Sequence, residues 1–478
     1  MSCTTKKYKM RRKKRKEYPI LENVEITAIA AEGKGLARVD NFVVFVDKAI
    51  PGDVINAKII QKKKDYAHAE IIDLLKPSNK RIDSFCEHFG TCGGCKWQHV
   101  DYKYQLEFKA NLVDEAFRRI GKMNIENIAP ILGCEETVFY RNKLEFTFSN
   151  RVWLTREQID SGESFDKNAL GFHTSGNFAS ILQINECYLQ DEKVNTIRNA
   201  VYKFAVENNF TFYNLKYHEG FLRNLIFRNT TLNEWMVTLC VAENDMEKIN
   251  FIMNFIKDSF PYITSLNYII NTKKNDTIYD QEVVTFYGRN HIIEQLGNVQ
   301  YKISTKSFFQ TNSKQAKRLY DIVKDFGNFT KDDLVYDLYC GTGSIALYIA
   351  NDCKKVVGIE QIPDAIVDAN FNATLNKIDN CVFHAGTCED ILKEDFIVQY
   401  STPDIVVVDP PRAGLHEKVI NVLLEAAPKK IVYVSCNPAT QARDVLLFSE
   451  KYKVTKCQPV DMFPHTFHIE NVVLLELV

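Results

Sequence analysis

The sequence predicts an α/β protein whose last part is an open, mostly parallel sheet. Four short apolar runs carry this prediction, at residues 334–339, 356–360, 405–408 and 431–434. A glycine turn, Cys-Gly-Thr-Gly-Ser at 340–344, separates the first run from an Ala/Ile-rich helical segment. Strand, glycine turn and helix in this order are typical of a Rossmann-like domain, in which the glycines let the backbone approach a nucleotide cofactor closely.

Length and composition indicate more than one folded domain. The chain has 478 residues, of which 45% are hydrophobic and 25% are charged, an ordinary composition for a globular protein. The formal net charge is −1, which argues against a uniformly basic surface for nucleic acid. We therefore expect two or three domains, with any basic surface confined to part of the chain.

The first 17 residues form such a local basic segment. Nine Lys and Arg residues lie between positions 6 and 16, so we expect a disordered basic arm over 1–17 that follows nucleic-acid phosphates without reading sequence. A solvated tail that only aids solubility is the alternative. No apolar run that follows is long enough for a signal-peptide core or a membrane span, which predicts a cytoplasmic protein.

Residues 18–77 predict a small all-β unit, an OB-like barrel. Segments 24–28 and 54–60 alternate apolar and polar residues, and 42–46 is an apolar run. Gly-Lys-Gly at 33–35 and Pro-Gly-Asp at 51–53 supply turns between these strands. Four lysines are expected on the rim, available to phosphates: Lys34, Lys62, Lys63 and Lys64.

Residues 78–303 predict a central α+β segment that begins with a metal-binding loop. Cys86, Cys92 and Cys95 lie on a glycine-rich stretch, and thirteen cysteines in a cytoplasmic chain point to metal binding or catalysis, not to disulfides. These thiols can bind one metal centre if the fold adds a fourth ligand. A four-cysteine zinc site and a 4Fe-4S cluster both fit this spacing. Three unliganded cysteines are the remaining alternative.

The same central segment also interleaves basic and aromatic residues. Tyr-Arg-Asn-Lys at 140–143 leads into an alternating strand at 144–148, and residues 218–223 with Arg228 repeat the pattern. Aromatic rings beside Arg and Lys suit unstacked RNA bases and phosphates. An exposed sheet face has the same composition, so the pattern predicts an RNA-binding surface without assigning its individual contacts.

Each apolar run of the C-terminal part delivers a candidate site residue at its carboxyl end. Glu360 follows the glycine turn by about twenty residues and can accept hydrogen bonds from both ribose hydroxyls. Asp409 begins Asp-Pro-Pro-Arg after the third run, and Cys436 lies in Ser-Cys-Asn-Pro after the fourth. Because ligands bind outside the carboxyl ends of parallel strands, we expect these segments to converge on one crevice.

A loop thiol and a later carboxyl group suit chemistry at C5 of a pyrimidine. Uracil C5 is too weak a nucleophile to attack a methyl donor unaided, so a thiolate first adds to C6 and makes C5 enolate-like. A base must later remove the C5 proton so that the thiol can leave. Cys436 is the candidate nucleophile, and Glu470, which ends Phe-Pro-His-Thr-Phe-His-Ile-Glu at 463–470, is the candidate base. A small buried hydrophobe is the alternative role for such a cysteine.

Together these motifs resemble those of the SAM-dependent RNA uracil-5-methyltransferases, which make 5-methyluridine in 23S rRNA and in tRNA. The resemblance covers nearly the whole chain and includes Phe-Phe-Gln at 308–310 and Asp-Leu-Tyr-Cys-Gly at 337–341. It implies a Rossmann-like SAM-dependent methyltransferase domain over 304–478, an N-terminal TRAM domain over 18–77, and a central iron-sulfur and RNA-binding domain over 78–303.

The resemblance also implies roles for single residues. The implied SAM contacts are Gln310, Tyr339, Glu360 and Asp409. The implied nucleophile and base are Cys436 and Glu470. The implied ligands of a 4Fe-4S cluster are Cys86, Cys92, Cys95 and Cys187, with Cys134 as a competing fourth ligand and zinc as the competing metal.

Substrate and assembly are predicted from the same resemblance. Bacterial family members that methylate tRNA typically lack both the TRAM barrel and the cysteine cluster, so the two together favour 23S rRNA, with tRNA as the alternative. Because the RNA-binding parts are self-contained, we expect a monomer.

Three other functions remain open from the residues alone. An amine methyltransferase would have an aromatic residue after Asp-Pro-Pro, where this chain has Arg412. A nicotinamide enzyme would explain the glycine turn but not the pairing of Cys436 with Glu470. A non-catalytic RNA-binding or ribosome-assembly factor would keep the fold and would lose nothing when Cys436 is replaced by alanine.

Overall fold

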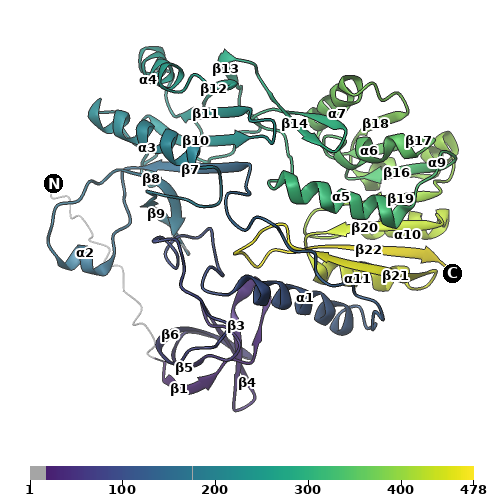
Figure 1. Cartoon of the computed structure of the whole chain (residues 1–478), viewed down its shortest axis with the longest axis horizontal. Helices are drawn as coiled ribbons and strands as arrows, with labels where there is room; N and C mark the ends of the chain where they lie inside the picture. The colour runs from purple at the N-terminus through teal and green to yellow at the C-terminus, as the bar shows by residue number, and fades with distance from the viewer. Residues whose placement is uncertain (1–17, 175) are drawn as a thin grey trace, which may run out of the picture. The chain divides into compact units, whose positions relative to one another are not determined.

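Figure 1 shows the computed structural model of the chain, which describes residues 18–174 and 176–478. The chain divides into two compact units, the first ending at Arg81 and the second running from Ile82 to Val478. The predicted basic arm at 1–17 lies outside the described residues. Among the helices of the described ranges, none is long and apolar enough to cross a membrane.

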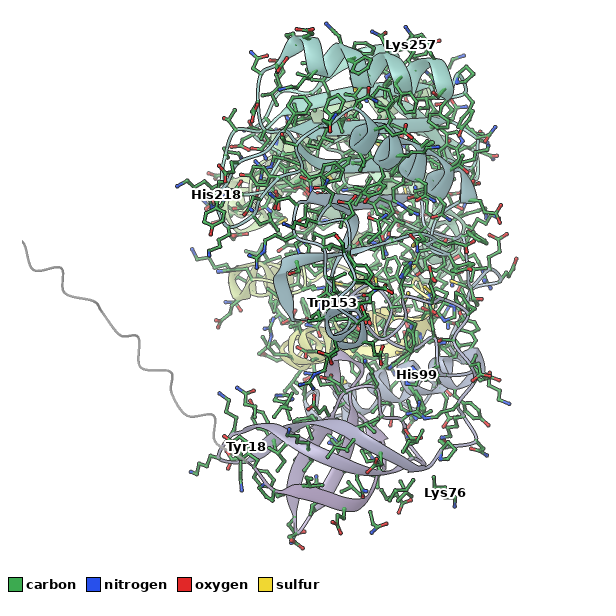
Figure 2. The ribbon with its side chains drawn as sticks, turned by 90° about the vertical axis from the view of Figure 1, so that its left-hand side faces the viewer. Tyr18, Lys76, His99, Trp153, His218 and Lys257 are labelled. Carbon is green, nitrogen blue, oxygen red and sulfur yellow. The ribbon has the colours of Figure 1, made fainter. Side chains whose placement is uncertain are left out.

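The first unit is built on one six-stranded sheet with the order β1-β5-β6-β4-β3-β2. Its strands are β1 (Ile20–Glu25), β2 (Ala28–Ile29), β3 (Gly35–Val39), β4 (Phe42–Val46), β5 (Val54–Lys62) and β6 (Tyr66–Lys76), and the short helix η1 (Ala31–Gly33) precedes β3. Figure 2 labels Tyr18 and Lys76 in this unit. The strands bury one apolar face, which includes Val44, Ile55 and Ala69.

A buried carboxylate fixes the turn that precedes β5. Asp53 accepts hydrogen bonds from the backbone amides of Ile50 (2.8 Å) and Ser78 (3.0 Å). Its carboxylate also pairs with the guanidinium of Arg81 at 2.6 Å. The side chains of residues 62–64, three of the four lysines expected at the rim, are exposed, so their charges are available to a polyanion.

The second unit begins with a seven-stranded sheet in the order β13-β12-β11-β10-β7-β8-β9. Its strands are β7 (Lys143–Ser149), β8 (Ala169–Thr174), β9 (Asn177–Gln183), β10 (Leu222–Asn229), β11 (Trp235–Val241), β12 (Ser265–Ile270) and β13 (Val284–Gly288). Helices α3 (Glu192–Glu207) and α4 (Met246–Ser259) cover one face of this sheet and share its apolar core, while α2 (Arg156–Asp160) lies in the connection between β7 and β8 (Figure 1).

The C-terminal sheet has the order β18-β17-β16-β19-β20-β22-β21. Its strands are β16 (Leu334–Leu338), β17 (Lys355–Glu360), β18 (Cys381–Ala385), β19 (Ile405–Val408), β20 (Lys430–Ser435), β21 (Tyr452–Val460) and β22 (Glu470–Leu477). Strands β16 to β20 are parallel, and β22 is antiparallel to both of its neighbours. The four predicted apolar runs are the strands β16, β17, β19 and β20.

Helices cover both faces of this sheet. One face packs against α5 (Ser313–Gly327), α6 (Ser344–Ile349) and α7 (Pro363–Leu375), with η2 (Ala350–Asp352) after α6. The other face packs against α1 (Tyr102–Arg119), α8 (Cys388–Ile391), α9 (Glu394–Tyr400), α10 (Glu417–Ala426) and α11 (Pro438–Phe448). An open parallel sheet with helices on both faces is the Rossmann-like arrangement that the sequence predicts.

Segments that precede residue 304 contribute to the core of this C-terminal sheet. The hairpin of β14 (Ile292–Leu296) and β15 (Val299–Ile303) belongs to the same apolar cluster as α5 and α6. Helix α1 also packs against α11 on the opposite face of the sheet. Residues 82–478 therefore form one compact unit, and the division at 303/304 stays a prediction.

Candidate active site

The strand register of the C-terminal sheet brings the candidate nucleophile and base together. Ser435, the last residue of β20, is paired with Asn471 of the antiparallel strand β22. Cys436 follows Ser435 and Glu470 precedes Asn471, so both leave neighbouring strands at the same edge. Residues opposite one another in antiparallel strands have Cα atoms ~4.5–5.5 Å apart. The fold thus sets a thiol against a carboxyl group.

Both side chains line a cavity of about 680 Å³. From the edge of the C-terminal sheet, the cavity is lined by Arg412, Cys436, Phe463, Thr466, His468 and Glu470. From the central segment, it is lined by Arg141 and Tyr188 and by all four candidate cluster ligands, Cys86, Cys92, Cys95 and Cys187. The sequence did not indicate that the candidate metal ligands and the candidate catalytic pair share one hollow.

Arg412 lies beside the thiol, although its motif indicated no catalytic role for it. Burial raises the pKa of Cys436 to about 11, the nearby carboxyl groups add to this rise, and the Arg412 guanidinium opposes it. Arg412 Nη2 is 2.9 Å from His468 Nδ1. The Arg412 carbonyl accepts hydrogen bonds from the side chains of Asn437 (3.0 Å) and Thr440 (3.2 Å). These contacts hold a permanent positive charge at the nucleophile.

Two carboxyl groups near this thiol have raised pKa values. Burial raises the pKa of Glu470 well above that of an exposed glutamate, the charge of Asp409 adds to the rise, and Arg412 opposes it. Burial alone raises the pKa of Asp409 to about 7. A desolvated carboxyl group holds its proton more tightly than one in water, so Glu470 in its ionised form is a stronger base than a surface carboxylate.

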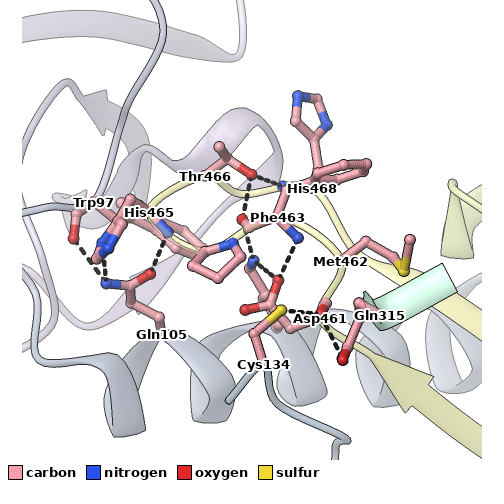
Figure 3. A network of polar contacts seen from close by, with 12 residues as sticks. Trp97, Gln105, Cys134, Gln315, Asp461, Met462, Phe463, His465, Thr466 and His468 are labelled. Carbon is pink, nitrogen blue, oxygen red and sulfur yellow. Dashed lines mark hydrogen bonds and ion pairs between the residues drawn. The ribbon is translucent and has the colours of Figure 1, made fainter. Parts of the chain in front are cut away.

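The loop that precedes Glu470 is fixed by a buried ion pair that includes Asp461, which Figure 3 labels. The ammonium of Lys109, from α1, lies 2.6 Å from the Asp461 carboxylate, and neither side chain is exposed to solvent. Burial lowers the pKa of Lys109, and the charge of Asp461 opposes this fall. Asp461 also accepts hydrogen bonds from the Tyr102 hydroxyl (2.8 Å) and the Phe463 amide (2.9 Å). The start of the loop is therefore tied to α1.

The middle of the same loop is tied to the cysteine-rich segment. The carbonyl of His465 accepts hydrogen bonds from the backbone amides of Lys96 (2.8 Å) and Trp97 (3.0 Å), directly after Cys95. Gln105 accepts from the His465 amide at 2.8 Å and lies 3.2 Å from the His465 ring (Figure 3). The segment that supplies candidate metal ligands thus also positions the loop that supplies the candidate base.

We expect Lys109→Met to be strongly destabilising, because it leaves the Asp461 carboxylate buried without its counter-ion. Breaking a buried ion pair costs about 3–5 kcal/mol. Urea unfolding followed by fluorescence measures the change. The matched control is Lys317→Met, which removes the partner of Asp321 from a half-exposed ion pair in α5, worth ~0–1 kcal/mol. Equal midpoints for the two variants would contradict a structural role for the buried pair.

The four candidate cluster ligands lie close enough to influence one another. Burial raises the pKa of Cys92 to about 11 and of Cys95 to about 12, and the thiols of Cys86 and Cys187 add to both rises. The backbone of Cys187 is held by the Asn195 side chain, which accepts from its amide (2.9 Å) and donates to its carbonyl (3.1 Å). Among the described residues, no three His, Cys, Asp or Glu side chains are grouped as around a single metal ion.

Cys134, the competing fourth ligand, lies elsewhere. Its thiol donates to the carbonyl of Asp461 at 3.0 Å and accepts from the Asn312 amide at 3.5 Å. Cys134 is not among the residues that line the cavity shared by the other four cysteines. The structure therefore brings Cys187, and not Cys134, to the cysteine-rich loop.

The glycine turn and the acid that follows β17 form one hydrogen-bonded unit. Gly341 and Gly343 have φ values of +54° and +74°, which favour glycine. A Cβ at Gly343 would lie 2.9 Å from the Phe383 ring. The Glu360 carboxylate accepts hydrogen bonds from the amides of Gly341 (3.1 Å) and Ile362 (2.8 Å). A carboxylate has about four acceptor sites, so Glu360 keeps capacity for ribose hydroxyls.

Of the other implied cofactor contacts, Tyr339 and Asp409 follow strands of the same sheet as this unit. Tyr339 follows β16 and lines a separate cavity of about 560 Å³, the cofactor-side cavity, with Cys388 and His416. Asp409 follows β19, the strand that pairs with β16 on the side opposite β17. Gln310 precedes α5, and its carbonyl accepts a hydrogen bond from the Asn142 side chain at 3.0 Å.

Comparison with protein families places this fold and site in one class. The parallel sheet, its glycine turn and the acid after the second strand agree with the fold of a SAM-dependent methyltransferase. Residues 101–478 match the family model described as tRNA (Uracil-5-)-methyltransferase, and residues 17–72 match the TRAM domain. The chain therefore belongs to the tRNA (uracil-5-)-methyltransferase family, and it is an RNA uracil-5-methyltransferase that uses SAM as methyl donor.

Similar proteins agree with this assignment. A protein described as an uncharacterized RNA methyltransferase from Bacteroides thetaiotaomicron is 50% identical, over 94% of this chain and 100% of its own length. A protein with the same description from Porphyromonas gingivalis is 47% identical, over 95% of this chain and 99% of its own length. A crystal structure of Pyrococcus abyssi tRNA (uracil-54, C5)-methyltransferase with S-adenosyl-L-homocysteine is 28% identical, with a TM-score of 0.74, over 95% of this chain and 99% of that one.

Proposed function

We propose that the protein methylates C5 of a uridine in 23S rRNA and that Cys436 binds C6 of the ring covalently during the reaction. The observation that supports the proposal most strongly is the placement of Cys436 opposite Glu470 at one cavity. Nucleophile and base are the two groups that C5 methylation requires. Arg412, in the position that amine methyltransferases give to an aromatic ring, adds a cation that favours a thiolate.

The first half of the reaction depends on Cys436 and Arg412. A uridine must leave its stack to expose C6, and it enters the cavity as a flipped base. Arg412 lowers the pKa of the thiol from its buried value, and the thiolate sulfur then forms a bond to C6. The electron pair of the C5–C6 double bond makes C5 the nucleophile. C5 takes the methyl group from the sulfonium of SAM, and S-adenosylhomocysteine leaves.

The second half depends on Glu470. Its carboxylate takes the C5 proton, the electron pair re-forms the C5–C6 double bond, and the C6–S bond breaks to restore the Cys436 thiolate. The raised pKa of Glu470 suits this role, because a stronger base removes a carbon-bound proton more readily. Gln310, Tyr339, Glu360 and Asp409 are the proposed SAM contacts, with Glu360 accepting from the ribose hydroxyls.

We further propose that Cys86, Cys92, Cys95 and Cys187 hold a 4Fe-4S cluster. Support comes from their shared cavity and from the mutual effect of the thiols on their pKa values. A bound cluster would cross-link segments that surround the cavity.

Metal content separates the two candidates for the fourth ligand. We expect Cys187→Ala to lose most of its iron, acid-labile sulfide and visible absorbance, and Cys134→Ala to keep wild-type amounts. The two substitutions remove the same atom, from a buried cysteine at 187 and from a partly buried one at 134, so each serves as the control for the other. Iron loss in Cys134→Ala but not in Cys187→Ala would reverse the assignment. If the anaerobically purified wild-type protein contains zinc and no iron, the four cysteines form a zinc site and not a 4Fe-4S cluster.

Transfer RNA is the second candidate substrate, and one observation favours it over 23S rRNA. The TRAM domain and the cysteine set together support 23S rRNA as the substrate. The solved structure of similar fold, however, is described as a tRNA methyltransferase, and 95% of this chain is covered by it. The part of this chain that the solved structure leaves uncovered is shorter than the TRAM match at residues 17–72, so at least part of the TRAM domain has a counterpart in that tRNA methyltransferase. The TRAM domain alone therefore does not distinguish an rRNA substrate from a tRNA substrate.

An adduct experiment tests both the chemistry and the substrate. The purified protein is mixed with SAM and with 23S rRNA or tRNA that contains 5-fluorouridine. Because fluorine cannot leave as a proton, the reaction is expected to stop after methyl transfer, with RNA bound to the Cys436 peptide through a denaturation-resistant bond. An adduct with tRNA alone would move the substrate to tRNA. The absence of an adduct with either RNA would refute the covalent mechanism and favour a non-catalytic RNA-binding role.

A further inference from the structure

A second cavity adjoins the one that holds Cys436 and Glu470. It has a volume of about 460 Å³ and is formed by the segment before the cysteine loop, the segment around Cys187, and helix α3. Glu186 and Tyr188 line both cavities. A group bound in the second cavity would therefore lie next to whatever occupies the first.

The walls of this second cavity are aromatic and acidic. The rings of Phe85 and Tyr188 meet edge to face, with centroids 5.2 Å apart. The carboxylates of Glu87 and Glu186 are exposed on the same cavity. None of the described residues that line it is Lys or Arg. A phosphate would be repelled there, whereas the flat face of a base can pack on the rings.

The polar groups of the cavity have a fixed arrangement and spare acceptor capacity. The backbone of Asn185 is held at its carbonyl by the buried guanidinium of Arg198 (2.6 Å) and at its amide by His88 Nε2 (3.1 Å). Glu186 accepts from the Tyr188 hydroxyl at 2.8 Å. Because an ionised carboxylate has about four acceptor sites and no donor, unused acceptors remain.

We propose that this cavity binds a second nucleobase of the RNA, one that carries an exocyclic amino group, beside the target uridine. The proposal rests on the proposed function in one respect, that the adjoining cavity receives the uridine. Adenine, cytosine and guanine present exocyclic amino groups that can donate hydrogen bonds to a carboxylate, whereas the one base donor of uracil, N3–H, lies between two carbonyl oxygens that a carboxylate repels. The cavity would thus set which base must accompany the methylated uridine.

Binding of short RNA tests the proposal without methyl transfer. The dissociation constants of a short oligouridylate and of its derivatives with one adenosine, cytidine or guanosine at each position are measured by fluorescence anisotropy. Wild-type protein is expected to bind a derivative about tenfold more tightly at one position. Glu87→Gln, which removes an acceptor, and Thr196→Trp, which fills the cavity from the exposed side of α3, are expected to lose this preference.

The matched control is Glu192→Gln, an exposed residue of α3 that does not line the cavity, and it is expected to keep the preference. No preference in the wild-type protein, or one that survives Thr196→Trp, would overturn the proposal. A preserved base preference in a protein that methylates no RNA would instead reject the proposed function and leave this site in place. Methylation without any base preference would reject the site alone.

Discussion

Replacing Cys436 by alanine is expected to abolish methylation and to abolish the adduct with 5-fluorouridine RNA. Without the sulfur, C5 of uracil cannot become nucleophilic enough to take the methyl group, and loss of a covalent nucleophile typically lowers kcat by at least about 10⁴-fold. Transfer of tritium from labelled SAM to RNA measures the rate, and gel electrophoresis under denaturing conditions measures the adduct. SAM binding, followed by calorimetry, is expected to remain.

The matched control for this variant is Cys381→Ala. Cys381 is the first residue of β18, so it lies at the edge of the parallel sheet opposite the proposed active site, and its replacement is expected to leave the methylation rate close to that of the wild type. A Cys436→Ala variant that methylates RNA within about tenfold of the wild-type rate would refute the covalent mechanism. Loss of both RNA binding and turnover in the two variants would point to misfolding of the sheet and not to loss of the nucleophile.

Replacing Glu470 by glutamine is expected to trap the enzyme on ordinary RNA. The amide cannot take the C5 proton, so Cys436 can add and the methyl group can be transferred, but the C6–S bond cannot be released. A denaturation-resistant complex should therefore form with RNA that contains unmodified uridine, together with one methyl group per complex and a loss of multiple turnover. Mass spectrometry of the digested complex identifies the peptide and the methylated base.

Glu476→Gln is the matched control, because Glu476 lies in the same strand β22 at the end away from the site. It is expected to turn over normally and to form no stable complex with ordinary RNA. If Glu470→Gln turns over close to the wild-type rate, another group removes the proton, and Asp409, whose pKa is raised to about 7, is the next candidate to replace.

Glu470→Gln should also change how the free energy of unfolding depends on pH. Glu470 has a raised pKa in the folded protein, so the folded state keeps a proton that the unfolded state releases above about pH 4.3. Stability is then lost as pH rises from that value through the folded pKa. Glu470→Gln removes this loss, so the variant should gain thermal stability relative to the wild type between about pH 5 and pH 8. If the difference in melting temperature between variant and wild type stays the same from about pH 5 to pH 8, the pKa of Glu470 is not raised in the folded protein.

Much of the fold could be predicted because its signals are local. The apolar runs that became β16, β17, β19 and β20 are short and continuous, as expected for strands buried on both faces. The glycine turn and the acid after β17 lie within one strand-helix-strand unit. Cys436 and Glu470 could be selected as a pair from chemistry alone, without knowing that β22 would bring them together.

The parts that could not be predicted depend on contacts between distant residues. Lys109 and Asp461 are separated by most of the second unit, and neither residue type signals a buried ion pair. The shared cavity of the cysteines and the catalytic pair requires two sheets to be placed side by side within that unit. Arg412 could have been found, since it occupies a motif position where a cation replaces an aromatic ring.

The position of β22 also sets when activity can arise during synthesis. This strand follows every other described element in the chain, yet it lies between β20 and β21 in the sheet. A nascent chain that has already folded β20 exposes Cys436 without Glu470. Since chains emerge from their N-terminal end at about 5–20 residues per second, the gap must stay open until the final strand has left the ribosome. A chain in which residues 470–477 have not yet been built into the sheet therefore has the proposed nucleophile but not the proposed base.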